Sequence, residues 1–164
     1  MWHTATRFDL TVEICSYCLA FKDEGHREWC KEKDMSKEIK QVIVVRKDTQ
    51  PQMRKGKCGA QCGHAVIAFF LARMKLVGKR KYEITLTEEE DIWKDAAQPK
   101  IVLGCDSEHE LLEIFNKAKV AGLEVHLIKD SGRTEFKEPT ITCIGIGPNY
   151  ADQIDAITGH LKLL

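Results

Sequence analysis

The residues best suited to chemistry lie in two short stretches, of which DSGRT at positions 130–134 is the first. It places a carboxylate, two hydroxyls and an arginine within five residues. Such a set can orient a water molecule and stabilise a developing oxyanion. The alternative is a turn that begins at Asp130 and uses the conformational freedom of Gly132, with the carboxylate accepting backbone N–H groups. The residues alone leave both interpretations open.

The second stretch is a predicted helix that begins at Gly56–Lys57. Gln61 and His64 follow Lys57 at positions i+4 and i+7, so a helix places all three side chains on one face. A lysine beside the free N–H groups of a helix N-terminus is a good ligand for a phosphate or an oxyanion. The helix dipole disfavours a cation at this end of a helix, so the presence of Lys57 there indicates a functional role. A single histidine in an apolar helix is, however, more often a core residue with one hydrogen bond.

Short apolar runs predict the elements that must position these residues. Strands are expected at 41–46, 100–105, 125–129 and 140–146. Helices are expected from Gly56 to a C-cap at Gly78, from Ser107 to Gly122, and over 151–158. Residues 79–98 look like a polar insertion with a short strand at 83–86 and an acidic helix after Thr87.

This order of elements indicates an α/β fold. The strand–helix–strand unit from Lys100 to Lys129 implies a right-handed crossover and a mostly parallel or mixed sheet. Sites in such sheets lie beyond the carboxyl ends of strands. Two polar loops follow strands in this way, DSGRT and Gly147-Pro148-Asn149. We therefore expect the site at these loops.

Composition bounds the class of protein. The chain has 164 residues, 43% of them hydrophobic and 30% charged, which suits one folded domain with a small appendage. The longest uncharged apolar run, Ala65–Ala72, is far shorter than the roughly 20 residues of a spanning helix. No basic region leads into an apolar stretch at the N-terminus. A soluble cytoplasmic protein without a membrane partner is expected.

The net charge of zero hides a strong asymmetry along the chain. Residues 46–81 hold ten Lys or Arg and one acid, a net of +9, whereas residues 83–113 are at −8. A basic block of this size suggests a polyanionic partner, although a solvated basic face would have the same composition. The candidate contacts share a place late in this block: Arg73, Lys75, Lys79, Arg80 and Lys81.

Seven cysteines without an export signal argue against a disulfide framework. Cys15, Cys18, His26 and Cys30 have the spacing of a tetrahedral structural zinc site. The charged stretch 31–40 reads as a linker, so we divide the chain into an N-terminal extension, residues 1–34, and a main domain, residues 35–164. Met35 resembles a translation start, and the extension is therefore either a zinc module or an upstream segment that was never selected to fold.

Several longer motifs resemble one known family. QVIVVRKD, RKGKCGAQCGHA, QPKIVL, AGLEVHLIKDSGRT, TCIGIGP and the closing ITGHLKLL are together similar to the peptidyl-tRNA hydrolase type 2 family, in uninterrupted order from about Lys40 to Leu164. The most specific are GKxxAQxxHA, the D-x-G-R-T loop and the terminal TGHLKL. The 79–98 stretch is longer and more polar than the link usual in this family.

The resemblance implies a fold, an activity and a site. The fold would be a compact three-layer α/β domain with a four-stranded mixed sheet flanked by helices, often dimeric. The activity would be hydrolysis of the ester between peptide and tRNA, without a cofactor for catalysis and without a covalent intermediate. The alternative is a tRNA-binding or adaptor module without turnover. The site would use Lys57, Asp130, Thr134 and Thr142 in catalysis, with Gln61, His64 and Arg133 beside the substrate.

Overall fold

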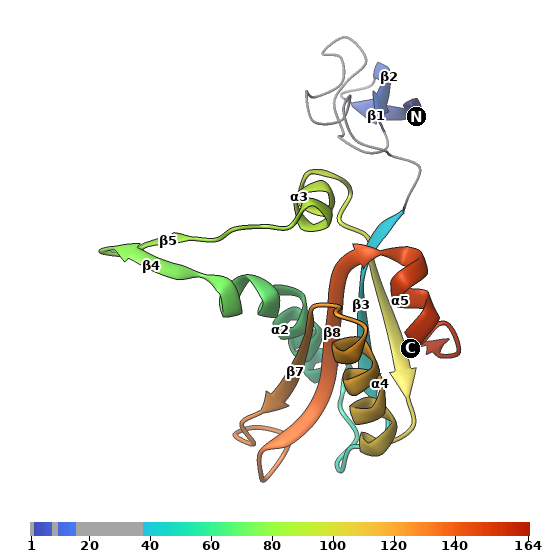
Figure 1. Cartoon of the computed structure of the whole chain (residues 1–164). Coiled ribbons are helices and arrows are strands. Elements are labelled where there is room, and N and C mark those ends of the chain that lie inside the picture. Colours follow the sequence, from blue (N-terminus) through green and yellow to red (C-terminus); the bar gives the residue numbers. More distant parts are fainter. Residues whose placement is uncertain (1, 8–9, 16–37) are drawn as a thin grey trace.

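Strand β3 (Ile39–Arg46) forms the centre of the fold because it is apolar on both faces. Val42 and Val44 pack into one core cluster and Ile43 and Val45 into another, as alternation along a strand requires. The computed structural model describes residues 2–7, 10–15 and 38–164. Figure 1 shows β3 inside the main sheet, with helices on either side.

The main sheet has five strands in the order β7-β8-β3-β6-β9. Strand β6 (Lys100–Cys105) is parallel to β3, whereas β8 (Thr140–Tyr150) is antiparallel to both β3 and β7 (Val125–Asp130). The expected mixed sheet is confirmed, but the expected count of four strands is wrong. The additional strand β9 (Lys162–Leu163) has only two residues, too few to leave a strand pattern in the sequence.

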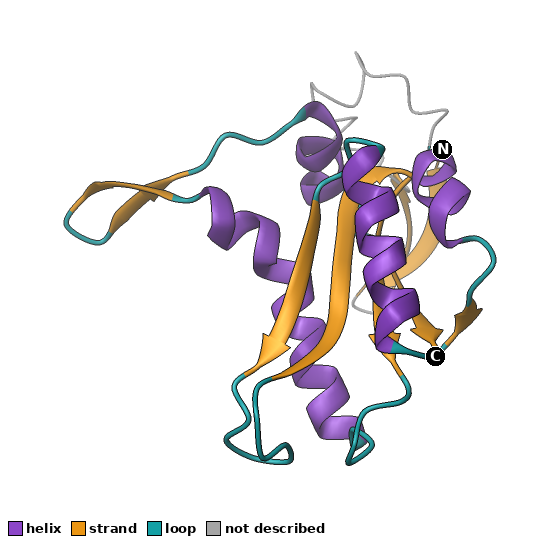
Figure 2. Ribbon diagram, turned by 60° about the horizontal axis from the view of Figure 1, so that its bottom comes forward, coloured by secondary structure: helices purple, strands orange, loops and turns teal. Residues whose placement is uncertain are grey.

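Helices cover both faces of this sheet, which confirms the expected three layers (Figure 2). Helices α2 (Lys55–Arg73) and α3 (Glu88–Asp95) lie on the face of Ile43 and Val45. Helices α4 (Glu108–Val120) and α5 (Ala151–Thr158) cover the opposite face. Helix α4 connects β6 to β7, which run in the same direction with β3 and β8 between them.

Helix α2 ends at Arg73 rather than at Gly78, because Met74 adopts an extended conformation. The next residues form strands β4 (Lys75–Gly78) and β5 (Lys81–Glu83), which pair antiparallel. We call residues 74–83 the arm. It projects from the body of the molecule (Figure 1) and, among the described elements, its strands contact only each other. The expected strand at 83–86 is therefore displaced toward the arm, whereas the acidic helix after Thr87 is confirmed as α3.

The expectation for Gly147-Pro148-Asn149 is wrong in both structure and place. These residues continue β8 rather than forming a loop after it, and the N–H group of Gly147 donates to the carbonyl oxygen of Glu124. Because β8 is antiparallel to β7, this segment lies at the end of the sheet opposite to Asp130. Of the two polar loops expected to carry the site, DSGRT after β7 is therefore the one that follows a strand.

The N-terminal part contains strands β1 (Trp2–Arg7) and β2 (Leu10–Cys15), which pair antiparallel. The division between residues 1–34 and 35–164 falls outside the described residues. Over the described part of the chain, no helix combines the length and the apolar character that crossing a membrane would require.

Candidate active site

Lys57 and Asp130 meet where the first turn of α2 lies against the end of β7. The ammonium group of Lys57 donates to Asp130 Oδ2 at 2.5 Å and to the hydroxyl of Thr134 at 2.9 Å. The side chains of Lys57 and Asp130 are only 10% and 9% exposed, so the pair is shielded from solvent over most of its surface. The two stretches that the sequence singled out therefore form one site.

Gln61 and Thr142 support this pair from inside the protein. The amide nitrogen of Gln61 donates to Asp130 Oδ2 at 3.0 Å, and its amide oxygen accepts from the hydroxyl of Thr142 at 2.8 Å. Gln61 and Thr142 are both buried. Because Thr142 occupies the amide oxygen, the amide group of Gln61 is held with its nitrogen toward Asp130.

An irregularity in β8 directs Thr142 toward the site. Ile128 pairs with Cys143 and Lys129 with Ile141, so Thr142 has no partner residue on β7. Such a shift of register locally bends a strand and reorients a side chain, and it recurs beside active sites. The hydroxyl of Thr142 lies 3.3 Å from the carbonyl oxygen of Ile128 as well as close to Gln61.

The loop after β7 closes back on Asp130. The N–H group of Gly132 donates to Asp130 Oδ1 at 2.9 Å, which is the turn that the sequence offered as an alternative to catalysis. Gly132 has a φ of +76°, and a Cβ there would lie 2.5 Å from the backbone of Glu138. Turn and site are thus the same structure.

These contacts hold Asp130 in its ionised form. The hydrogen bond from Lys57 is the main cause that lowers the pKa of Asp130, and burial acts in the opposite direction. The N–H group of Gly132 and the amide of Gln61 lower the pKa further. A carboxylate held in this way is a weak base, so it is better suited to orienting a water molecule than to removing its proton.

The hydrogen bonds also indicate where a substrate can be contacted. Asp130 Oδ2 accepts from both Lys57 and Gln61, whereas Oδ1 accepts only from Gly132 among the described residues. A carboxylate oxygen accepts about two hydrogen bonds, so Oδ1 has room for a water molecule. Lys57 has three N–H donors and uses two on Asp130 and Thr134, which leaves the third for an oxyanion.

Known proteins of one family resemble this chain over most of its length. The family model described as "Peptidyl-tRNA hydrolase PTH2" matches residues 39–164. The chain belongs to this family. A peptidyl-tRNA hydrolase of Methanocaldococcus jannaschii is 43% identical over 126 residues, which are 77% of this chain and all of that protein. A second from Sulfolobus acidocaldarius is 41% identical over the same length, again covering all of the relative.

A mitochondrial relative is longer than the region it shares with this chain. Peptidyl-tRNA hydrolase 2, mitochondrial, of Bos taurus is 44% identical over 128 residues, which cover 78% of this chain. The aligned region covers only 65% of the bovine protein. This chain therefore spans about two thirds of the length of the bovine protein.

Two other residues that the sequence predicted for the site are exposed, His64 and Arg133. His64 is exposed on α2 and makes no hydrogen bond with another described residue, so it is not a core histidine. Arg133 is exposed in the loop after β7. Sequence reasoning missed Phe136, which is 2% exposed and whose ring centre lies 5.5 Å from the ammonium nitrogen of Lys57. The sequence did contain a feature that could have indicated its burial: Phe136 is the one large apolar residue between Asp130 and Thr140.

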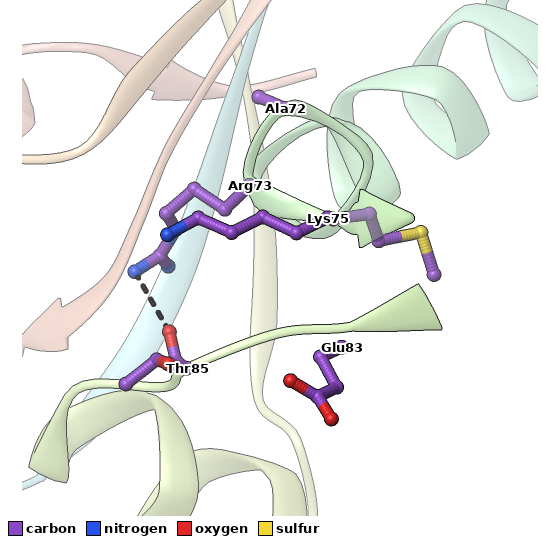
Figure 3. Close-up of a pocket in the computed structure, with 6 residues that line it drawn as sticks. Ala72, Arg73, Lys75, Glu83 and Thr85 are labelled. Atoms are coloured by element: carbon purple, nitrogen blue, oxygen red, sulfur yellow. Dashed lines mark hydrogen bonds between the residues drawn. The ribbon is translucent and has the colours of Figure 1, made fainter. Parts of the chain in front are cut away.

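The predicted tRNA contacts lie at the far end of α2. From Lys57 to Arg73 the helix rises about 24 Å, at 1.5 Å per residue. Arg73 pairs with the buried Glu90 and lines a pocket of about 430 Å³ at the root of the arm. In Figure 3 the cationic ends of Arg73 and Lys75 lie on the same side of this pocket. The other three predicted contacts are exposed in the arm: Lys79, Arg80 and Lys81.

The predicted zinc ligands belong to the N-terminal part of the chain. Cys18, His26 and Cys30 lie outside the described residues, and of Cys15 only its place at the end of β2 is described. Within the part of the chain that the structure describes, no three His, Cys, Asp or Glu side chains gather so as to hold a metal ion.

Proposed function

We propose that this chain hydrolyses the ester bond between the peptide and the terminal ribose of peptidyl-tRNA. The observation that carries the proposal is the contact of Lys57 with Asp130 and Thr134, in a chain of the peptidyl-tRNA hydrolase PTH2 family. One water molecule is consumed: its oxygen joins the acyl carbon, and the ribose oxygen leaves as a hydroxyl. The products are free tRNA and the peptide carboxylate.

Asp130 orients the attacking water in this mechanism. The ionised carboxylate accepts a hydrogen bond from the water at Oδ1, the oxygen that Gly132 occupies only in part. Because the pKa of Asp130 is lowered, the carboxylate keeps its charge over the physiological pH range. Holding the water near the acyl carbon removes much of the entropic barrier to attack.

Lys57 stabilises the charge that develops on the ester carbonyl oxygen. Its position is fixed by Asp130 and Thr134, so no reorganisation is needed when the oxyanion forms. Thr134 orients the ammonium group, and Thr142 acts through Gln61 on Asp130. Thr142 is therefore a positioning residue, whereas Lys57 and Asp130 face the reacting atoms.

Release of tRNA from N-acetyl-aminoacyl-tRNA tests this proposal. We expect turnover by the wild-type chain and a fall of at least about tenfold in both Asp130→Ala and Lys57→Ala, since each removes a group that acts in the transition state. Lys47→Ala is the matched control, because Lys47 pairs with Asp106 at the surface. Turnover that survives Asp130→Ala would exclude the role in orienting water. A folded wild-type chain that binds tRNA without turnover would instead be a binding module.

We also propose that the arm binds the tRNA part of the substrate. Lys79, Arg80 and Lys81 are exposed at its tip, and Arg73 and Lys75 line the pocket at its root. Lysine and arginine contacts to phosphates give strong salt dependence and little sequence preference. Hydrolysis that differs strongly among tRNAs at physiological salt would contradict this role.

A homodimer is the assembly that we propose. Ile67 and Leu71 are 43% and 58% exposed and lie one turn apart on α2, with the exposed Met74 following. Pairing this row with the same row of a second copy would remove it from water. Sedimentation of the purified chain tests the proposal, and a monomer at every concentration would contradict it.

The cytoplasm is the compartment that we propose. Cys58, Cys62, Cys105 and Cys143 are free thiols, which suits a reducing environment. The bovine relative is named as mitochondrial, so imaging of the tagged chain in its own cells must distinguish the two compartments. Retention in mitochondria would contradict the proposal.

Structural zinc at Cys15, Cys18, His26 and Cys30 also stays a proposal. It rests on the spacing of four soft ligands. Metal analysis of the full chain beside a chain that starts at Met35 tests it. Zinc well below one equivalent in both would contradict a zinc module and leave residues 1–34 as an extension.

A further inference from the structure

Strand β7 is an outermost strand of the main sheet. Its inner edge pairs with β8, and no other described strand pairs with its outer edge (Figure 2). Helices α2 and α4 contact β7 from the two faces of the sheet. Within the described part of the chain, the outer edge of β7 therefore has no partner in the plane of the sheet, and another chain can add there as a strand.

The register identifies which backbone groups point outward. Gly147 donates its N–H to the carbonyl oxygen of Glu124, so these two residues form a hydrogen-bonded pair. Such pairs alternate with non-bonded pairs along antiparallel strands. Leu127, opposite Ile144, belongs to a non-bonded pair. Its N–H and C=O groups therefore point away from β8, and its side chain is 36% exposed.

This open edge leads directly into the site, because β7 ends at Asp130. If the chain acts on peptidyl-tRNA as proposed above, its substrates carry peptides whose side chains vary and whose backbone amides do not. A strand edge recognises an extended peptide through those amides. The backbone amides of the substrate peptide can therefore pair with the outward N–H and C=O groups of β7.

We propose that the peptide part of the substrate binds as an additional strand on the outer edge of β7. The ester must lie at Asp130, where β7 ends, and the peptide ends at the same ester. The bound peptide therefore runs parallel to β7. The three residues from Leu127 to Asp130 span about 10 Å, at 3.3 Å per residue. A peptide must have three or four residues to reach the outward groups of Leu127, and a single N-acetylated amino acid does not reach them.

Leu127→Pro tests the inference because proline removes the outward N–H group of this residue. Proline is tolerated in edge strands where the N–H faces away from the neighbouring strand. Leu127→Ala is the matched control, since it shortens the side chain and keeps the N–H. The two substrates are N-acetyl-aminoacyl-tRNA and an N-acetyl-tetrapeptidyl-tRNA, compared by kcat/KM.

We expect the wild-type chain and Leu127→Ala to prefer the longer substrate by about tenfold, the effect of one or two hydrogen bonds. Leu127→Pro should lose this preference and keep its activity on the short substrate. Equal rates on both substrates in the wild type would overturn the inference and leave the hydrolase proposal intact. If neither substrate is turned over, both the inference and the hydrolase proposal are contradicted.

Changes in the substrate test the other outward group of Leu127, its C=O, without altering the fold of the protein. Replacing the backbone amides of the tetrapeptide one at a time by esters removes one N–H donor each. We expect a single position, two or three residues from the scissile ester, to lower kcat/KM of the wild type and of Leu127→Ala, because both keep the outward C=O group that accepts this N–H. A uniform response along the peptide would contradict binding at this edge.

Discussion

The charge of Asp130 depends on one neighbouring residue more than on any other. The hydrogen bond from Lys57 is the main cause of the lowered pKa, and burial alone would raise it. In Lys57→Met the burial stays and the cation is lost. We therefore expect the pKa of the Asp130 carboxyl group to move upward in this variant, as measured by NMR titration of the labelled side chain.

The control for that titration is Lys47→Met. Lys47 pairs with the exposed Asp106, so this variant removes one positive charge without changing the surroundings of Asp130. The titration of Asp130 should then match that of the wild type. An unchanged titration in Lys57→Met would mean that the ion pair does not hold the carboxylate ionised in solution.

Thr142 offers a second test at the same scale. Thr142→Val keeps the shape of the side chain and leaves the amide oxygen of the buried Gln61 without its donor. The free energy of unfolding should fall by about 1–3 kcal/mol, and kcat should fall because Gln61 no longer holds its nitrogen toward Asp130. Urea unfolding and steady-state kinetics measure the two effects.

Thr158→Val separates the two effects. Thr158 is buried and donates to the carbonyl oxygen of Ile154 within α5, far from the site. We expect normal kcat and a smaller loss of stability, because the carbonyl oxygen of Ile154 keeps its helical N–H donor. Thr142→Ser keeps the hydroxyl and should restore kcat. A normal kcat in Thr142→Val would show that Thr142 serves stability alone.

At the residue scale, the sequence predicted part of the site. The i+4 spacing placed Gln61 on the face of Lys57, and Gln61 contacts Asp130 together with the lysine. The same periodicity also placed His64 there, yet it is exposed. Periodicity gives a face but not the depth at which each turn of the helix meets the sheet. The orientation of Thr142 depends on a shift of register between strands, which no local pattern encodes.

The loop after β7 is the element that joins the sheet to the site. In Gly132→Ala the new methyl group would meet the backbone of Glu138 in a conformation with positive φ. We expect a loss of about 1–3 kcal/mol in stability and a fall in kcat, because the loop also carries Thr134. Thermal unfolding and hydrolysis of N-acetyl-aminoacyl-tRNA measure these effects.

Gly122→Ala is the matched control for this loop. Gly122 has nearly the same φ, +75°, but a Cβ there meets no atom within 4 Å. The variant should show the backbone strain without the steric clash and without an effect on kcat. Equal effects of the two variants on kcat would contradict a specific role of the loop.

Elements with a strong apolar pattern were predictable, and those set by long-range pairing were not. The cores of β3, β6, β7 and β8 were expected at nearly their observed places. The end of α2 was wrong because Leu76 continues the helical spacing, yet it pairs with Tyr82 in the arm. The extension of β8 through Pro148 was missed because a Gly-Pro pair usually ends a strand.

The distribution of charge matters at the scale of the whole molecule. The tip of the arm carries Lys79, Arg80 and Lys81, at the opposite end of α2 from Lys57. Changing these three residues to Gln should reduce the slope of log K for tRNA binding against log salt by about 2–3, since each phosphate contact contributes about 0.7–0.9. The saturated hydrolysis rate should not change.

The control for that experiment removes three charges elsewhere. Lys117 and Lys119 on α4 and Lys162 on β9 are exposed on other parts of the surface. Their change to Gln should leave the salt dependence near that of the wild type. Equal slopes in the two triple variants would mean that only the net charge matters, and not the arm.

The arm lies at a point in the chain that separates strands which are neighbours in the sheet. A cut by trypsin at Lys79–Lys81 would give one piece with β3 and another with β6 and β8, yet β3 lies between β6 and β8. The two fragments would therefore stay interlocked after cleavage. Lys57 lies on the first fragment and Asp130 on the second, so neither has a complete site. We expect the two fragments, expressed separately, to restore hydrolysis only when they are mixed.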